Sequence, residues 1–184
     1  MDKTVLVAYG TKYGATAEIA EKIGQVLRQA GLRADVLSAD RVADLHAYDA
    51  VALGSAVYIG RWRKEAAKFL EANQAALSEK PVWLFSSGPT GEGDPAELTQ
   101  GWKLPGKLQP IADRIGPRDI AVFHVASDPE KLNFIEKWML KNVKAPVGDF
   151  RDWEAITSWA EGIAKELQGS PGPQQRHRSS APPP

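Results

Sequence analysis

The sequence of 184 residues contains no cysteine, and this absence excludes several kinds of chemistry. Without thiols the chain can form no disulfide, no thiolate nucleophile and no cysteine-ligated iron–sulfur or zinc centre. The three histidines, His46, His124 and His177, lie far apart and show none of the spacings that metal-binding motifs use. We therefore expect no metal site.

The chain also lacks an excess of one charge and a long apolar run. Its 23 lysines and arginines balance 23 aspartates and glutamates, which argues against a nucleic-acid partner. No apolar stretch approaches the roughly 18 residues that a membrane-spanning helix needs, and the N-terminal run is too short for a signal sequence. We expect a soluble, cytoplasmic protein and leave open a peripheral contact with the inner face of the membrane.

Short apolar runs alternate with amphipathic patterns along the chain. The runs, which are typical of buried parallel strands, cover residues 4–8, 32–37, 50–53, 82–85 and 120–125. Helical spacing covers residues 17–30 and 62–77, and two further stretches near 130–144 and 152–167. Strands that alternate with helices imply right-handed crossovers and helices on both faces of one sheet. This rhythm predicts a doubly wound three-layer α/β sandwich with a five-stranded parallel sheet of order 2-1-3-4-5.

Two segments depart from this rhythm. Residues 88–117 are rich in glycine and proline and contain one short helical piece, 108–115; a loop of this length is more often functional than idle. From Gly169 the sequence reads GSPGPQQRHRSSAPPP, which cannot form a core. We therefore expect one folded domain over residues 1–168 and a disordered tail over residues 169–184.

The loop after the first strand has the composition of an anion site. It reads TKYGAT, residues 11–16, and continues directly into a helix, whose first N–H groups and dipole attract phosphate. Thr11 and Thr16 add hydroxyl groups, and Gly14 permits close approach of the backbone. The alternative is that Thr11 or Thr16 only caps the helix.

The loops after the third and fourth strands meet the first loop where strand order reverses, which is where such sheets bind ligands. In SAVYIGRW, residues 55–62, Tyr58 can stack on a flat ring; alternatively, Tyr58 covers the sheet and Trp62 packs within a helix. SSGPTG, residues 86–91, lets backbone amides reach the rim of a ring, although alone it would pass for a plain connector. Together the three loops predict a flavin site built from Thr11, Lys12, Tyr13, Gly14, Ala15, Thr16, Ala56, Val57, Tyr58, Ile59, Ser86, Ser87, Gly88, Pro89, Thr90 and Gly91.

Other kinds of nucleotide site are excluded because their sequence motifs are absent. No G-x-x-x-x-G-K-[ST] string follows a strand, and G-x-G-x-x-G is absent from the sequence. A phospho-receiver domain shares this topology but has acidic residues where Tyr9, Gly10, Gly54 and Ser55 stand here. A flavin site is the interpretation that fits these residues.

TKYGAT resembles the phosphate loop of flavodoxin-like proteins, T-x-T-G-x-T, in which Thr11, Gly14 and Thr16 match. This resemblance implies a flavodoxin-like fold, FMN as the cofactor and a role in electron transfer. Tyr13 replaces the usual threonine and Ala15 replaces a common asparagine, which removes a hydroxyl and an amide contact. A flavin-free binding module on the same fold therefore stays open as an alternative.

GSAVYIGRW, KPVWLFSSGP and EKWMLKNVKAPVGDFRDWEAITSWAEGIAKEL resemble the menaquinone-dependent protoporphyrinogen oxidase family, over residues 3–167. The resemblance implies an oxidoreductase whose FMN takes electrons from a tetrapyrrole substrate, a porphyrinogen, and passes them to a quinone. Arg61 and Arg63 are then candidates for pairing with its propionates. No general base stands out, so we assign no catalytic residue. The alternative is a flavodoxin-type electron carrier that serves a redox partner and has no substrate of its own.

Overall fold

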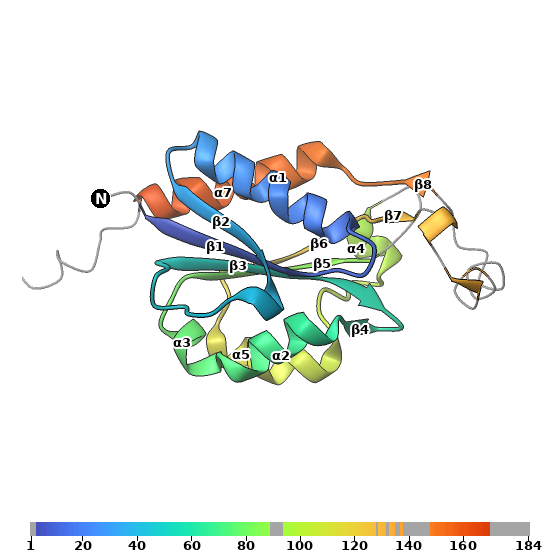
Figure 1. Ribbon diagram of the computed structural model, residues 1–184, viewed down its shortest axis with the longest axis horizontal. Helices are drawn as coiled ribbons and strands as arrows, with labels where there is room; N and C mark the ends of the chain where they lie inside the picture. The colour runs from blue at the N-terminus through green and yellow to red at the C-terminus, as the bar shows by residue number, and fades with distance from the viewer. Residues whose placement is uncertain are drawn as a thin grey trace, which may run out of the picture.

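The computed structural model describes residues 3–88, 94–127, 129–131, 133–134, 137 and 148–169. Figure 1 shows a central sheet between two layers of helices. Helices α1 (Ala15–Gln29) and α7 (Trp153–Gly169) cover one face of this sheet. Helices α2 (Lys64–Ala72), α3 (Gln74–Ser78) and α5 (Gln109–Ile115) cover the other face, which gives the predicted three-layer sandwich (Figure 1).

Five parallel strands form the sheet in the order β2-β1-β3-β5-β6. These strands are β1 (Thr4–Gly10), β2 (Arg33–Ser38), β3 (Ala50–Tyr58), β5 (Val82–Ser87) and β6 (Asp119–Phe123). Counted among the parallel strands alone, this is the order 2-1-3-4-5, so the predicted doubly wound sheet is confirmed. The two-residue strand β4 (Arg61–Trp62) pairs antiparallel with β3, and β7 (Ala126–Ser127) pairs with β8 (Gly148–Asp149) as a separate ribbon.

The core lies on both faces of the sheet, because successive side chains of a strand point to opposite sides. In β1, Val5 and Val7 pack under α1 and α7, whereas Leu6 and Ala8 pack against the layer of α2, α3 and α5. All four side chains are completely buried. Burial on both faces explains why the strands read as continuous apolar runs and not as alternating ones.

The third strand was predicted to end at Leu53, but β3 continues to Tyr58. Gly54, a residue type common in turns, lies inside the strand against the ring of Phe85. A Cβ atom at Gly54 would lie 2.1 Å from the Cζ atom of Phe85, so no larger residue fits there. The glycine is required by packing between neighbouring strands and does not mark a turn.

The predicted single helix over residues 62–77 is also wrong. Trp62 belongs to β4, and the helical part is divided into α2 and α3 at Asn73, whose side-chain amide donates to the carbonyl oxygen of Phe69 at 2.8 Å. The irregular segment before β6 contains α4 (Pro95–Leu98), the 3₁₀ turn Gly106–Leu108 and α5. Two short 3₁₀ turns occupy Ala39–Arg41 and Pro129–Lys131. Most of the predicted helix 130–144 and of the tail 169–184 lies outside the described residues, so the domain boundary stays a prediction.

This topology decides where a ligand site forms. Strand β1 lies between β2 and β3, so the chain leaves β1 toward one face of the sheet, through α1, and leaves β3 toward the other, through α2. The carboxyl ends of β1, β3 and β5 therefore meet at one edge, where the helical layers diverge. No helix in the described part of the chain is long and apolar enough to cross a membrane.

Candidate functional site

The loop between β1 and α1 is folded around the hydroxyl of Thr11. The backbone N–H of Gly14 donates to Thr11 Oγ1 at 3.1 Å, and Gly14 itself adopts a left-handed conformation with φ of 93°. Gly14 is the N-cap of α1 and makes no side-chain capping bond. The first N–H groups of a helix have no partner within that helix, so they are available to an anion.

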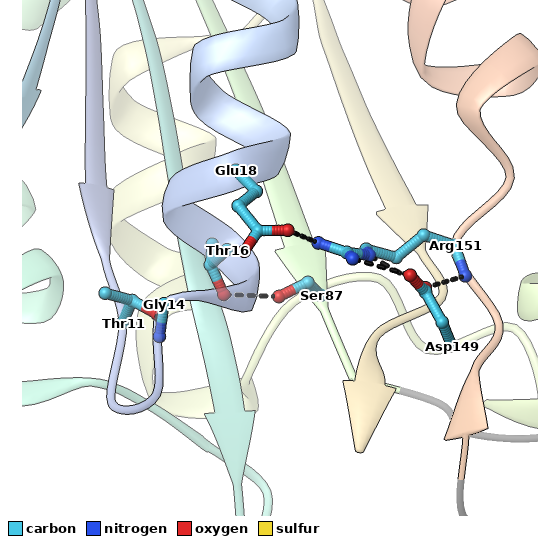
Figure 2. A network of polar contacts seen from close by, with 7 residues as sticks. All are labelled: Thr11, Gly14, Thr16, Glu18, Ser87, Asp149 and Arg151. Carbon is cyan, nitrogen blue, oxygen red and sulfur yellow. Dashed lines mark hydrogen bonds and ion pairs between the residues drawn. The ribbon is translucent and has the colours of Figure 1, made fainter. Parts of the chain in front are cut away.

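The first turn of α1 is fastened to the end of β5 through two buried hydroxyl groups. Thr16 and Ser87 are 0% and 1% exposed, and their oxygens lie 2.8 Å apart. Figure 2 shows this contact beside the Thr11–Gly14 loop. Thr16 therefore bonds across to β5 and does not cap its own helix, so the capping alternative fails for Thr16. The contact also joins the first and third of the predicted loops.

The second predicted loop, residues 55–62, is a hairpin in the structure. Val57 pairs with Trp62 and Tyr58 with Arg61, so only Ile59 and Gly60 lie outside the strands. Their φ angles of 49° and 66° are both positive, which is the signature of a type I′ turn. A left-handed conformation is rare for a β-branched residue, and Ile59 is 81% exposed. The hairpin thus holds an apolar side chain at the rim of the site at a cost in backbone strain.

Two tyrosines and two cations meet where the first loop faces the hairpin. The rings of Tyr13 and Tyr58 have centroids 6.4 Å apart at an interplanar angle of 63°. The Nζ atom of Lys12 lies 5.0 Å and 5.5 Å from these two centroids, and the guanidinium carbon of Arg63 lies 6.0 Å from that of Tyr58. Such cation–π contacts hold the ring of Tyr58 at the sheet edge. Tyr13, which replaces the threonine of the flavodoxin pattern, therefore packs against the second loop.

A buried hydrogen-bonded chain fastens the hairpin to β5. The indole N–H of Trp62 donates to Ser86 Oγ at 2.9 Å, and the Ser86 hydroxyl donates to the carbonyl oxygen of Lys103, also at 2.9 Å. Trp62 thus supports the site from β4. The alternative, in which Trp62 packs within a helix, is wrong. Ser86 is completely buried and its hydroxyl both accepts and donates, so the hydroxyl is committed to contacts within the protein.

The remaining predicted residues follow from these elements. Ala56 and Val57 lie in β3, and Gly88, the residue after β5, donates its N–H to the carbonyl oxygen of Phe123 at 3.2 Å. Ala15 is the first residue of α1. Pro89, Thr90 and Gly91 lie outside the described residues. Arg61 is exposed on β4, and Arg63 forms an ion pair with Glu65 at 3.5 Å.

An ion cluster beside the first turn of α1 was missed from the sequence. Arg151 donates to Asp149 through Nε at 2.8 Å and through Nη2 at 2.6 Å, and its Nη1 contacts Glu18 (Figure 2). The hydrogen bonds from Arg151 hold the pKa of the Asp149 carboxyl below its ordinary value, and Asp149, followed by Glu18, raises the pKa of Arg151. Glu18 and Arg151 are 133 positions apart, so no spacing pattern signals their contact.

Comparison with known proteins is consistent with this geometry. Residues 6–153 match the family model described as a flavodoxin domain. The protoporphyrinogen IX dehydrogenase [quinone] of Escherichia coli K12 is 22% identical over 170 residues, covering 86% of this chain and 93% of that protein. Among solved structures, a flavodoxin from the domain Archaea superposes with a TM-score of 0.59 at 15% identity, covering 90% of this chain and 99% of its own. Oxidised flavodoxin 2 from Bacillus cereus gives 0.57 at 20% identity, covering 89% and 99%.

Proposed function

The chain belongs to the flavodoxin domain family and binds FMN, and from this premise we propose that it is an FMN-dependent dehydrogenase that takes electrons from a porphyrinogen and delivers them to a quinone. The redox role follows from the family. The choice of substrate and acceptor is supported by the similarity to the protoporphyrinogen IX dehydrogenase [quinone] of Escherichia coli, at 22% identity over most of both chains.

The residues of the site fit the cofactor. The FMN phosphate requires neutral N–H and O–H donors, and α1 begins without a side-chain cap directly after a loop that bends at Gly14. The isoalloxazine requires an aromatic neighbour and a backbone rim. We assign these roles to Tyr58 and to the loop 86–91, of which residues 89–91 lie outside the described residues. The observation that carries the proposal is that contacts between Thr16 and Ser87 and between Tyr13 and Tyr58 join all three segments at one sheet edge.

FMN, when bound, supplies the chemistry, because its ring accepts a hydride or electrons from one molecule and passes them to another. The protein's own residues bind and orient. Thr11 and Thr16 belong to the phosphate loop, and Tyr58 limits the position of the ring. No side chain needs to act as a strong base for this task, which agrees with the lack of a candidate in the sequence.

A porphyrinogen carries propionate groups, and the hairpin offers cations to receive them. Arg61 is exposed one residue beyond the turn, and Arg63 follows at the start of α2. A guanidinium binds a carboxylate through two parallel hydrogen bonds, which suits orientation of a large planar substrate. Because quinones are lipid-soluble, contact with a membrane surface stays a prediction of this proposal.

The second candidate function is a flavodoxin-type electron carrier, which is favoured by the solved structures that superpose on this chain. One experiment separates the two. FMN-loaded protein is incubated without oxygen with protoporphyrinogen IX and a water-soluble naphthoquinone, and protoporphyrin fluorescence is recorded. A dehydrogenase produces protoporphyrin only when both protein and quinone are present. A carrier leaves the porphyrinogen untouched and instead takes electrons from a flavodoxin reductase.

A further inference from the structure

Glu18 places a negative charge close to the end of α1 that is expected to receive the FMN phosphate. Its backbone N–H donates to the carbonyl oxygen of Gly14 at 3.1 Å, so Glu18 lies in the first turn above the phosphate loop. A helix N-terminus attracts anions, but two anions at the same end repel each other. Glu18 on its own would therefore weaken the binding of a phosphate.

Arg151 supplies the compensating charge from the other end of the chain. The Arg151 side chain is only 9% exposed, whereas that of Glu18 is 59% exposed. Asp149 accepts two hydrogen bonds from the guanidinium, and the ring of Trp153 lies 4.6 Å below it. These contacts leave Nη1 directed at Glu18 (Figure 2). The contacts with Asp149 and Trp153 therefore hold the guanidinium in position independently of Glu18.

The packing of α1 against α7 has other sources of stability, so the ion cluster is not required for it. Ile23 and Leu27 of α1 and Ile163 and Leu167 of α7 belong to one buried apolar cluster. In Figure 2, both Glu18 and Thr16 come from the first turn of α1, Glu18 directed toward Arg151 and Thr16 toward Ser87. The cluster therefore lies at the phosphate end of the helix pair.

We propose that Arg151 is a positioning residue for the FMN phosphate: by holding Glu18 and offsetting part of the negative charge of Glu18 and Asp149, it allows a second anion to bind at the start of α1. This inference rests on the proposed FMN site. It assigns to segment 148–153, far from the phosphate loop in sequence, a part in selecting the phosphorylated flavin. The selection acts through charge, so it concerns FMN and not riboflavin.

The test compares FMN with riboflavin, which has the same ring and no phosphate. Both are titrated, with quenching of flavin fluorescence as the readout, against wild-type protein and the variants Arg151→Gln, Glu18→Gln and the double variant. At low salt, Arg151→Gln should weaken FMN binding on the order of tenfold and change riboflavin binding by less than about twofold. Adding Glu18→Gln should restore FMN binding, and the loss should shrink in high salt.

Matched controls separate charge from structure. Arg28→Gln removes a similar ion pair further along the same helix, where Arg28 contacts Glu21 at 2.8 Å, and should leave the preference for FMN unchanged. Arg151→Lys keeps the charge and should retain most of the preference. If Arg151→Gln does not fold, Glu18→Gln alone, at an exposed position, should still tighten FMN and not riboflavin severalfold.

Three results would overturn the proposal. Equal losses for FMN and riboflavin would show that Arg151 only shapes the site, and an unchanged FMN affinity in both Arg151→Gln and Glu18→Gln would show that the charges do not reach the phosphate. Wild-type protein that binds neither flavin would overturn the proposed function as well. Failure of wild-type protein to bind flavin is seen before any variant is compared, so failure of the proposed function can be distinguished from failure of the role proposed for Arg151.

Discussion

The hydroxyl oxygens of Thr16 and Ser87 lie 2.8 Å apart and join the first turn of α1 to the end of β5. Both residues are buried, so each hydroxyl depends on the other for a hydrogen-bonding partner. Replacing one of them tests whether the pair serves the flavin, the fold or both.

Thr16→Ala removes one hydroxyl of this pair and leaves Ser87 unpaired. We expect FMN binding to weaken by about 1–3 kcal/mol, because a buried polar partner is lost next to the phosphate loop. Titration of flavin fluorescence measures the change, and Thr16→Ser, which keeps the hydroxyl, is the matched control. Unchanged FMN affinity together with a lower unfolding midpoint would mean that the pair serves the fold alone.

Ile59→Asn changes the first central residue of the type I′ turn. Asparagine adopts a left-handed conformation readily, whereas an isoleucine side chain there costs roughly 1 kcal/mol or more. We expect the free energy of unfolding of the flavin-free variant to rise by about 1 kcal/mol, which is seen as a higher urea midpoint. FMN binding should weaken if the Ile59 side chain covers the ring. Ile59→Val, also β-branched, should give no gain in stability. A less stable Asn variant would contradict the strain that we infer from φ.

Asp149→Asn tests the ion cluster through its pH dependence. Because Arg151 lowers the pKa of Asp149 in the folded protein, the pair contributes stability above the unfolded-state pKa of about 3.9. This contribution is lost as the pH falls through the lower, folded-state pKa. The difference in urea midpoint between wild type and variant should therefore be largest near neutral pH and vanish in strong acid. A difference that is constant with pH would assign the effect to packing.

Arg61→Gln addresses the substrate. If the exposed guanidinium on β4 receives a propionate, the KM for protoporphyrinogen should rise about three- to tenfold while kcat changes little, since the contact is equal in the ground and transition states. Arg33→Gln, which removes an exposed arginine from the first position of β2, at the amino ends of the strands, is the control. Equal KM values in the two variants would remove Arg61 from the substrate site.

The order of the strands could be predicted because buried parallel strands leave apolar runs in the sequence, and those runs were correctly located. The errors arose where one residue type serves two purposes. Gly54 is typical of a turn, yet here it makes room for the ring of Phe85 within β3. Trp62 happens to lie at helical spacing from Ala66 and Phe69, although it is the second residue of a hairpin strand.

The three loops that we propose for the site could be located individually in the sequence, but the contacts between them could not be predicted. The Thr16–Ser87 and Trp62–Ser86 bonds depend on how the strands are placed side by side, and this placement has no local signature. The same is true of Arg151, whose partner Glu18 comes from the first helix. Long-range polar contacts are decided by the assembled sheet, and no periodicity in the sequence encodes them.

The bonds between Thr16 and Ser87 and between Trp62 and Ser86 are formed by the protein's own side chains, so these segments are ordered before any flavin arrives. Fixing the backbone of one residue costs about 1–2 kcal/mol in conformational entropy. For these residues the cost reduces the free energy of folding and not the free energy of FMN binding. Preorganisation of this kind lets a cofactor leave and return without unfolding its receptor. The protein is therefore expected to exchange its flavin reversibly, as a rigid receptor does.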